Sequence, residues 1–214
     1  MRREHIILDS GIQPVFYVPL TTDNVDIVSG QGPISTSNVS THNSNGVSLS
    51  NGWLAYSSSL FSWMNYNTSF TILADFRGSN FSSGWRKVCT FSSTTSPYYE
   101  VGLSVSKDSG NVKYGSMRYD HDGVADLNNV VGSTTSSNVM YNKCGLVYDG
   151  NTHLFRLIEN GLISQNTSYT VYGVRNDCDF YIGKSTGSGA YWYGYIRNVM
   201  IFNKALTEQE IQEL

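Results

Sequence analysis

The sequence predicts an all-β protein built as a two-sheet antiparallel sandwich, with one short helix at its C-terminus. Three observations support this prediction. Apolar and polar residues alternate with period two in many short segments, as they do in half-buried strands. Asn160-Gly161 separates two apolar runs, which is a strong signal for a two-residue hairpin turn. Thr207 and Glu210 have the spacing of a capping box, which marks the start of a helix.

In the first half of the chain, strands are expected wherever the alternation is regular. Segment 99–106 has the clearest pattern, because aromatic or aliphatic residues alternate there with Glu, Gly or Ser. Segment 69–77 repeats the pattern. Further strands are expected at 15–20, around 47–56, at 86–91 and at 111–119. The polar stretch 29–45 contains Gly30, Gly32 and Pro33 and lacks alternation, so we expect it to be a surface loop.

In the second half, a long strand is expected at 139–148, ending at Asp149-Gly150. Strands at 153–159 and 162–164 flank the Asn-Gly turn, and others are expected at 169–174, 179–183 and 193–202. The C-terminal helix is too short to be stable alone, so it must pack on the sandwich through Ile211 and Leu214. About a dozen strands in 214 residues fit one domain, which we assign to residues 14–214.

Composition excludes several classes of partner. The formal net charge is -3 and the pI is about 5.7, which disfavours nucleic acid. The sequence contains no apolar run long enough to span a membrane. Cys89, Cys144 and Cys178 are odd in number and widely spaced within strand-like segments, so we expect buried free thiols rather than a disulfide framework.

Residues 1–13 precede the domain and mix charges with the apolar run Ile6 to Leu8. That run is too short for a signal peptide, so the sequence shows no leader. We interpret this segment as an N-terminal arm able to dock onto a neighbouring protein or to mediate homo-oligomer formation. The expected location is a virion surface. Secretion or display on a cell surface is the alternative if a leader is missing from this sequence.

The C-terminal half resembles the laminin-G-like, concanavalin A-like jelly-roll domains. The resemblance covers roughly residues 45–214 and is strongest in the last 75 residues. It lies in the strand ending Tyr148-Asp149-Gly150, the Asn160-Gly161 hairpin, the Phe180-Tyr-Ile-Gly183 strand, the closing segment Gly194 to Ile211, and Ser69-Phe-Thr-Ile72 upstream. The resemblance implies a two-sheet jelly roll with a central final strand, but one architecture hosts many functions.

Two departures from the family pattern bear on chemistry. Glycosidases on this jelly roll use two glutamates in Glu-x-Asp-x-(x)-Glu on one strand. Here Glu100 and Glu159 are solitary, and Glu208 and Glu210 belong to the predicted helix. Many members also carry acidic residues after the isoleucine of the final strand, where they help to bind calcium. Arg197 and Asn198 occupy those positions, which argues against a family-type calcium site.

Aromatic residues are the remaining signal for ligand binding, because sugar C–H faces stack on Trp and Tyr. Trp85 lies in a polar loop, and Tyr98 and Tyr99 follow Pro97, so these three are the predicted ligand-binding residues. The family usually carries one aromatic residue for packing before the position of Gly194, so the resemblance implies packing for Trp192. Trp53 and Trp63 have apolar neighbours and are also expected to pack.

No cofactor is predicted. Asp120, Asp122 and Asp126 are weak candidates for calcium ligands, because Asp-Gly is also an ordinary turn. Gly183-Lys184-Ser185-Thr186 imitates the end of a phosphate-binding loop but lacks the earlier glycine and the following helix. The histidines are too scattered to form a metal site or a catalytic triad by pattern.

The sequence therefore favours a non-enzymatic recognition or adhesion module that binds glycans through loops at one rim or through its concave sheet. Similar modules without a leader are frequent in bacteriophage structural proteins, so a surface component of a phage virion is the expected setting. The alternative is a capsid or tail decoration protein that binds neighbouring virion proteins. A glycosidase is the least favoured class.

Overall fold

The computed structural model describes residues 11–78, 84–93, 99–108, 111–120, 130–131, 141–164, 175–186 and 190–214. For 84–85, 99, 106–108, 111–120, 130–131 and 164 it describes the backbone alone. The strands in these ranges are β1 (Phe16–Val18), β2 (Ser35–Asn43), β3 (Gly46–Tyr56), β4 (Phe70–Gly78), β5 (Gly84–Ser93), β6 (Tyr99–Asp108), β7 (Asn111–Asp120), β8 (Val130–Val131), β9 (Tyr141–Asp149), β10 (Leu154–Glu159), β11 (Leu162–Ser164), β12 (Asp179–Ile182) and β13 (Trp192–Phe202). A 3₁₀ turn covers Ser58–Phe61, and helix α1 covers Glu208–Glu213.

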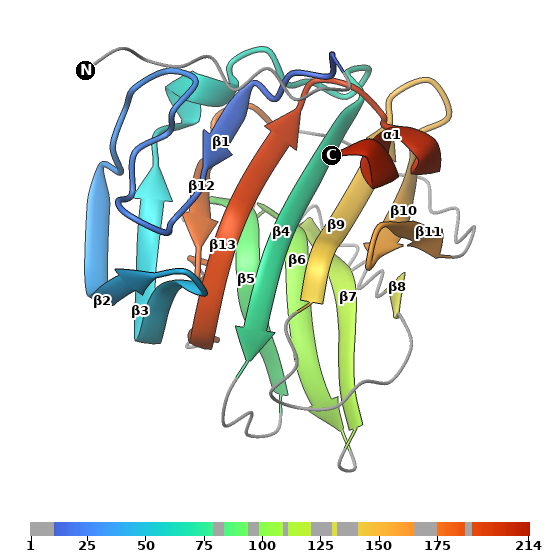
Figure 1. Cartoon of the computed structure of the whole chain (residues 1–214). Coiled ribbons are helices and arrows are strands. Elements are labelled where there is room, and N and C mark those ends of the chain that lie inside the picture. The colour runs from blue at the N-terminus through green and yellow to red at the C-terminus, as the bar shows by residue number, and fades with distance from the viewer. Residues whose placement is uncertain are drawn as a thin grey trace.

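The strands form one antiparallel sheet that curls into two layers (Figure 1). Its order is β11-β10-β9-β4-β13-β3-β12-β5-β6-β7-β8, while β1 pairs with β13 and β2 with β3. Figure 1 shows β3, β13, β4 and β9 in front of β5, β6 and β7. Strand β12 joins the layers because it pairs with β3 on one side and β5 on the other. The predicted antiparallel jelly roll with a C-terminal helix is confirmed, and β13 is central as expected.

The main core lies between the two layers and is rich in aromatic rings. Phe61 meets Phe91 edge-on with ring centroids 4.9 Å apart, and Phe16 meets Tyr56 at 5.0 Å. Trp192 is completely buried and packs edge-on against Phe76, which confirms its predicted packing role. Such edge-on pairs add to the stabilisation that burial of the rings already provides.

A second, smaller core lies on the other side of the β4–β13–β9 region, beneath α1. Leu73, Met200 and Phe202 form its floor, and Leu206 and Ile211 cover them from the C-terminal segment. The predicted capping box is present: Glu210 N–H donates to Thr207 Oγ1 (3.2 Å), and Thr207 N–H donates to Glu210 Oε2 (2.9 Å). The helix is thus anchored as the sequence predicts. No helix in the described part of the chain is long and apolar enough to cross a membrane.

Local turn chemistry also matches the sequence. Asn160 and Gly161 have φ angles of 50° and 81°, as a type I′ turn requires, and Glu159 pairs with Leu162 across it. The three cysteines are free and buried, as predicted. Burial raises the pKa of the Cys89 and Cys144 thiols to about 12, so neither is a ready nucleophile.

One prediction of local structure was wrong. The stretch 29–45 was expected to be a loop, but residues 35–43 form β2. Its side chains are exposed or only partly buried, so neither face imposes an apolar alternation. The strand exists because its backbone pairs with β3, a tertiary cause that leaves no period in the sequence. The strand expected at 169–174 lies outside the described residues.

Candidate functional site

The candidate site is on the outward face of β3, β12 and β13, meaning the face turned away from the main core. On β12, Phe180 and Ile182 are fully buried, whereas Tyr181 between them is partly exposed. On β3, Leu54 and Tyr56 are fully buried, whereas Trp53 is partly exposed. Period-two alternation therefore places Trp53 and Tyr181 on the outward face, side by side on neighbouring strands.

A β-bulge turns Trp53 outward. Leu49 and Leu54 are both buried although five positions separate them, which regular alternation does not allow. Asn51, with a φ of 59°, is the extra residue, because Tyr193 pairs with Ser50 and Trp192 with Gly52. The sequence predicted a packing role for Trp53, and Trp53 does pack against Tyr181, but it does so on the outward face and not in the main core. The run Trp-Leu-Ala-Tyr shows no alternation, and the bulge that decides its orientation was not recognised.

Lys184 completes a cluster with the two rings. The Trp53 and Tyr181 rings are 6.2 Å apart at 62°. Lys184 Nζ lies 3.4 Å from the Trp53 centroid and 5.0 Å from the Tyr181 centroid, both within the range of cation–π attraction. Partial burial lowers the pKa of the Lys184 ammonium from its usual value. Trp53, Tyr181 and Lys184 are called the aromatic–lysine cluster below.

The backbone that carries Lys184 is firmly held. Gly183 has a φ of 92°, its N–H donates to the Val88 carbonyl (2.8 Å), and its carbonyl accepts from Trp192 N–H (2.8 Å). A Cβ at position 183 would lie 2.6 Å from the Gly52 carbonyl oxygen, so only glycine fits. Thr90 Oγ1 donates to the Lys184 carbonyl (2.8 Å). The cluster therefore rests on fixed backbone, which suits a preformed binding site.

Two further tyrosines on the same face also lie against cations. Tyr193 and Tyr195 of β13 pair with Ser50 and Ser48 of β3, and each is partly exposed. The Arg77 guanidinium carbon is 4.8 Å from the Tyr195 centroid. The corresponding distance from Arg86 to Tyr193 is 5.6 Å. The outward face thus repeats one motif, an aromatic ring beside a positive charge, along β3, β12 and β13.

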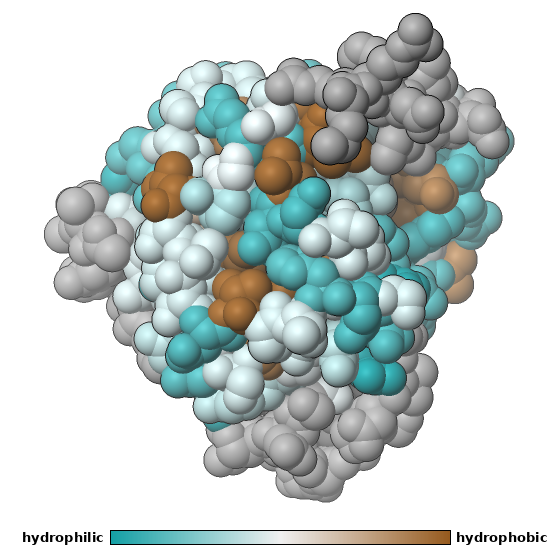
Figure 2. Space-filling view, turned by 60° about the vertical axis from the view of Figure 1, so that its left-hand side comes forward, coloured by the Kyte–Doolittle hydropathy of each residue, from teal (hydrophilic) through white to brown (hydrophobic). Residues whose placement is uncertain are grey.

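The surface around this region is polar rather than apolar. Figure 2 shows the side of the molecule that carries β2 and β3; pale and teal atoms predominate, and brown atoms occur in small, separate groups. The large apolar side chains that are exposed in the described part of the chain are Val28, Ile34 and Leu162. Half-buried aromatic rings in a polar, hydroxyl-rich surface can stack on sugar rings while neighbouring groups bind hydroxyls.

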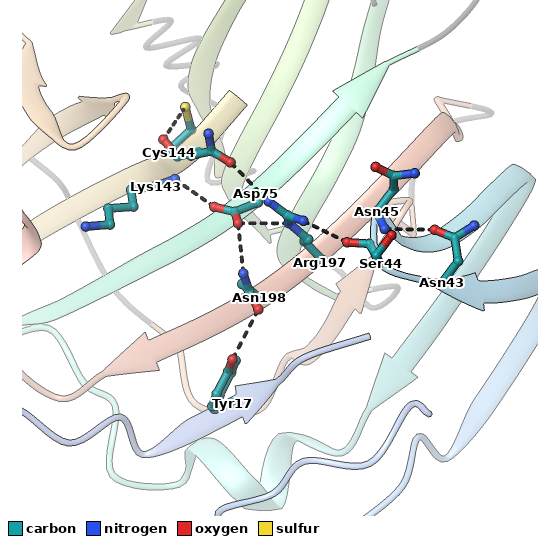
Figure 3. A network of polar contacts seen from close by, with 10 residues as sticks. Tyr17, Asn43, Ser44, Asn45, Asp75, Lys143, Cys144, Arg197 and Asn198 are labelled. Atoms are coloured by element: carbon teal, nitrogen blue, oxygen red, sulfur yellow. Dashed lines mark hydrogen bonds and ion pairs between the residues drawn. The ribbon is translucent and has the colours of Figure 1, made fainter. Parts of the chain in front are cut away.

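A polar network lies at the bulge of β13, which follows Tyr195 along the strand (Figure 3). Asp75 Oδ2 accepts from Asn198 Nδ2 (2.8 Å) and Arg197 Nε (3.2 Å). Its Oδ1 accepts from Lys143 N–H (2.8 Å), and Tyr17 OH donates to Asn198 Oδ1 (3.1 Å). Burial, followed by the Asp75 charge, raises the pKa of Tyr17. Both Asp75 oxygens are thus occupied by protein donors.

This network explains what the two non-acidic residues after Ile196 do. Arg197 and Asn198 supply a cation and an amide to Asp75, and this residue is only 7% exposed. The Arg197 side chain also donates through Nη1 to the Ser44 carbonyl (2.7 Å), so it ties β13 to the turn between β2 and β3. The arrangement is structural. Among the described residues, no group of three or more His, Cys, Asp or Glu side chains could hold a metal ion.

Another buried charge pair lies on β5 and β6. Lys87 Nζ donates to the Glu100 carboxylate, and the two residues are 2% and 9% exposed. Glu100 shares its face of β6 with Gly102 and Ser104, and the next acidic residue along that strand is Asp108, eight positions away, whose side chain is not described. Paired-carboxylate glycoside hydrolysis needs a second acidic group across the scissile bond. Glu100 is therefore best explained as the counter-ion of Lys87.

The ligand-binding residues predicted from sequence are not brought together by the backbone. The prediction that Trp85 lies in a loop was wrong, because its backbone belongs to β5 and pairs with Ser106 at one end of the β5–β6 ladder. Tyr99 pairs with Ser93 at the other end. Eight residues of β5 separate these positions, which corresponds to about 26 Å of strand. Tyr98 lies outside the described residues, and so do the side chains of Trp85 and Tyr99. Their role in binding stays a prediction.

The predicted calcium ligands are also largely outside the described residues. Asp120 is the last residue of β7, where its backbone pairs with Tyr99, and its side chain is not described. Asp122 and Asp126 lie wholly outside the described ranges. The pattern of the sequence assigned none of the residues of the outward aromatic face to binding, and it favoured packing for Trp53. The available signal was Tyr181 and Tyr195 at alternating, outward positions.

Comparison with known proteins shows the family of the chain. Residues 30–212 match a laminin G family model that is described as the concanavalin A-like lectin/glucanases superfamily. This match includes β2 to β13 and the aromatic–lysine cluster. No curated protein sequence matches the chain.

Solved structures with the same fold include three kinds of protein. A Trypanosoma rangeli sialidase bound to the inhibitor DANA aligns with TM-score 0.70 and 13% identity over 93% of this chain and 32% of the sialidase. The binding domain of Paraclostridial Mosquitocidal Protein 1 aligns with TM-score 0.66 and 15% identity over 93% of this chain and 51% of that one. A heptameric SAP-like pentraxin from Limulus polyphemus gives TM-score 0.52 and 13% identity, covering 69% of each chain. The chain spans about a third of the sialidases, and these identities show a shared fold alone.

Proposed function

The chain belongs to the concanavalin A-like lectin/glucanase superfamily, and from this premise we propose that it is a non-enzymatic module that binds glycans. The observation that carries the proposal is the row of partly exposed aromatic rings on the outward face, Trp53, Tyr181, Tyr193 and Tyr195. Hydroxyl-bearing residues lie beside two of these rings, because Ser50 pairs with Tyr193 and Ser48 with Tyr195. Sugar recognition combines these two kinds of group.

A binding role is supported over catalysis by the state of the buried carboxylates. Asp75 is occupied by three donors, and Glu100 is paired with Lys87. Hydrolysis of a glycosidic bond requires two acidic groups that are free to act on the substrate, whereas these carboxylates are engaged by protein donors. The similarity to the binding domain of a mosquitocidal protein and to a pentraxin is consistent with recognition, although it extends to the fold only.

A glycan array tests the proposal. The full chain, Trp53→Ala and Trp85→Ala should be compared on one array, with circular dichroism confirming that each variant is folded. We expect wild-type binding to at least one glycan and its loss in Trp53→Ala. If Trp85→Ala loses binding while Trp53→Ala keeps it, the site lies at the rim predicted from sequence. The absence of wild-type binding to every sugar would refute the glycan proposal.

The proposed setting is the surface of a bacteriophage virion. This rests on the occurrence of similar modules in phage structural proteins and on no residue of the chain. Secretion or display on a cell surface is the alternative setting. Antibodies raised against the chain should label intact particles purified from the source of the gene. Labelling of cell envelopes with unlabelled particles would favour the alternative.

A second candidate function, a decoration protein that binds its neighbours, is favoured by β2. Its nine residues pair with β3, and within the described part of the chain no strand pairs with its other edge. Such an edge can accept a strand from another protein. The predicted N-terminal arm is a second docking element, although Ile12 at its end packs against the second core of its own chain.

Deletion of residues 1–10 tests the docking arm and leaves Ile12 in place. If the arm mediates assembly, the truncated chain should sediment as a smaller species than the full chain in analytical ultracentrifugation, or should fail to enter particles. Equal assembly by both chains would eliminate the arm and leave β2 as the remaining candidate.

A further inference from the structure

The charge of Lys184 is unusually placed for a surface lysine. We infer that the aromatic–lysine cluster selects glycans that carry a carboxylate on the sugar ring, with Lys184 binding the carboxylate and Tyr181 and Trp53 flanking the sugar. This inference rests on the proposed glycan-binding function and specifies its ligand class. The relevant ligand chemistry is a ring-borne carboxylate, as in uronic or sialic acids.

The first support is that Lys184 has no anionic partner among the residues that the structure describes. Other basic side chains do have partners: Arg197 pairs with Asp75, Lys204 with Glu210, and Lys87 with Glu100. Lys184 instead lies over aromatic rings, and no described oxygen accepts a hydrogen bond from its ammonium. An ammonium has three donors, so this one can still bind an incoming anion.

The second support is the environment of that ammonium. Partial burial against Trp53 and Tyr181 removes water from the charge, and the same burial lowers the Lys184 pKa. A bound carboxylate would supply the missing counter-charge in a setting where water competes less than at an open surface. Charge-assisted hydrogen bonds of this kind are the stronger ones in proteins.

The third support is the balance of charge around the cluster. The nearby carboxylates already accept protein hydrogen bonds: Asp179 Oδ1 accepts from Ser58 N–H (2.9 Å), and Asp75 and Glu100 are engaged as described above. Arg77 lies on the same face against Tyr195, and no described carboxylate forms an ion pair with it. Lys184 and Arg77 therefore have no ion-pair partner among the described residues, and Asp179 adds one negative charge on the same side of β12, where burial, followed by the Asp179 charge, raises the pKa of Tyr181.

The aromatic rings distinguish a sugar acid from a simple anion. A free phosphate or carboxylate would use Lys184 alone, whereas a pyranose acid would also contact the flanking rings. The carboxylate of such a sugar would then bind the Lys184 ammonium beside the aromatic rings that contact the sugar. Both contacts should therefore contribute to affinity, and removal of either should weaken binding.

The experiment compares ligands with and without a charged carboxylate. Isothermal titration calorimetry measures oligogalacturonate and its methyl ester against the full chain. A glycan array adds sialylated and desialylated pairs, so that the two sources of carboxylate are distinguished. The variants are Lys184→Gln, Lys184→Arg and Lys143→Gln. Lys143→Gln makes the same change in net charge at a site where Nζ binds the Gln212 carbonyl near α1.

We expect the wild-type chain to prefer the acidic member of at least one pair. Lys184→Gln should reduce that affinity about tenfold, the factor that corresponds to one charge-assisted hydrogen bond, and should lower the affinity for the neutral member less. Lys184→Arg should keep most of the preference, and Lys143→Gln all of it. The preference should weaken with added salt.

The outcomes separate this inference from the function on which it rests. Equal binding of acidic and neutral members, or an unchanged preference in Lys184→Gln, overturns the role of Lys184 while glycan binding stands. Binding of free inorganic phosphate as tight as that of the acidic sugars also overturns it, because the rings then contribute nothing. Failure to bind any glycan refutes the proposed function and the inference together.

Discussion

The outward face of strand β13 is partly exposed in the first half of the strand and buried in the second half. Before the bulge at Arg197 and Asn198, its outward residues are Tyr193 and Tyr195, which are partly exposed and lie against cations. After the bulge they are Met200 and Phe202, which are 8% and 1% exposed beneath α1. The same strand thus carries a candidate binding surface and part of a core. What covers the sheet decides which of the two each half becomes.

The bulge makes this division possible. Outward residues have odd numbers before it and even numbers after it, because one extra residue shifts the alternation. Asn198 adopts a φ of 49° there and, with Arg197, binds Asp75 on β4. The boundary between the open and covered halves is therefore a fixed, hydrogen-bonded feature. The predictions below test whether the two halves differ in stability and function as their coverage indicates.

The largest effect is expected from Phe202→Ala in the covered half. Phe202 is almost completely buried in the second core, so its truncation should lower the free energy of unfolding by about 3–5 kcal/mol. Chemical denaturation measures the loss. A loss below about 1 kcal/mol would show that the residues of this half do not form a stabilising core. The two halves of β13 would then not differ in their contribution to stability.

Asp75→Ala should have the next largest effect because it removes the carboxylate at the boundary. Arg197, Asn198 and the Lys143 N–H would lose their acceptor, which should lower the free energy of unfolding by about 2 kcal/mol. Asp75→Asn keeps the shape and one acceptor, so it is the matched control and should lose less. Equal stability of Asp75→Ala and wild type would contradict a structural role for the network.

Thr207→Ala tests the helix that covers the second half. Loss of the Thr207 Oγ1 acceptor at the helix start should lower the free energy of unfolding by about 1 kcal/mol. Thr207→Ser keeps the hydroxyl and should be close to wild type. Amide hydrogen exchange should also become faster in α1 than in β3. Unchanged exchange in α1 would mean that the cap does not hold the cover in place.

Tyr195→Ala in the open half should leave stability within about 1 kcal/mol of wild type, because it removes a partly exposed ring and one cation–π contact. Its glycan binding should nevertheless fall if the open half is functional. Comparison of the two variants tests the division of the strand, since Tyr195→Ala should impair glycan binding and Phe202→Ala should impair stability. Loss of stability without loss of binding in Tyr195→Ala would reverse the assignment.

The smallest effect is a dependence of stability on pH through Glu210. A hydrogen bond from Lys204, followed by one from the Thr207 backbone, holds the pKa of Glu210 below its ordinary value of 4.5. Because the folded pKa is the lower one, this contribution is present above the unfolded pKa and is lost as pH falls through the folded pKa. Melting temperatures between about pH 6 and about pH 3 should therefore fall less in Glu210→Gln than in wild type. Parallel curves would exclude this linkage.

Where a feature depends on neighbours in the sequence, it was predictable. The alternation of residues 99–106, the Asn160-Gly161 turn and the Thr207 capping box each involve residues within a few positions of one another. These features are stabilised by short-range interactions, so they can be predicted from the sequence directly. The buried position of Trp192 was predicted in another way, through the resemblance to a family that carries one packing aromatic before the position of Gly194.

Strand β2 and the candidate site were not predictable in this way. Strand β2 owes its existence to backbone pairing with β3, and the site depends on two bulges, at Asn51 and at Arg197–Asn198, and on the return of Lys184 over Trp53. A bulge reverses the face of every residue after it without altering composition. The sequence by itself therefore determined the jelly roll, its turns and its capped helix, because these follow from short-range preferences. Only the tertiary structure decided which aromatic rings face outward and which charges remain uncompensated, because those depend on pairing between segments far apart in the chain.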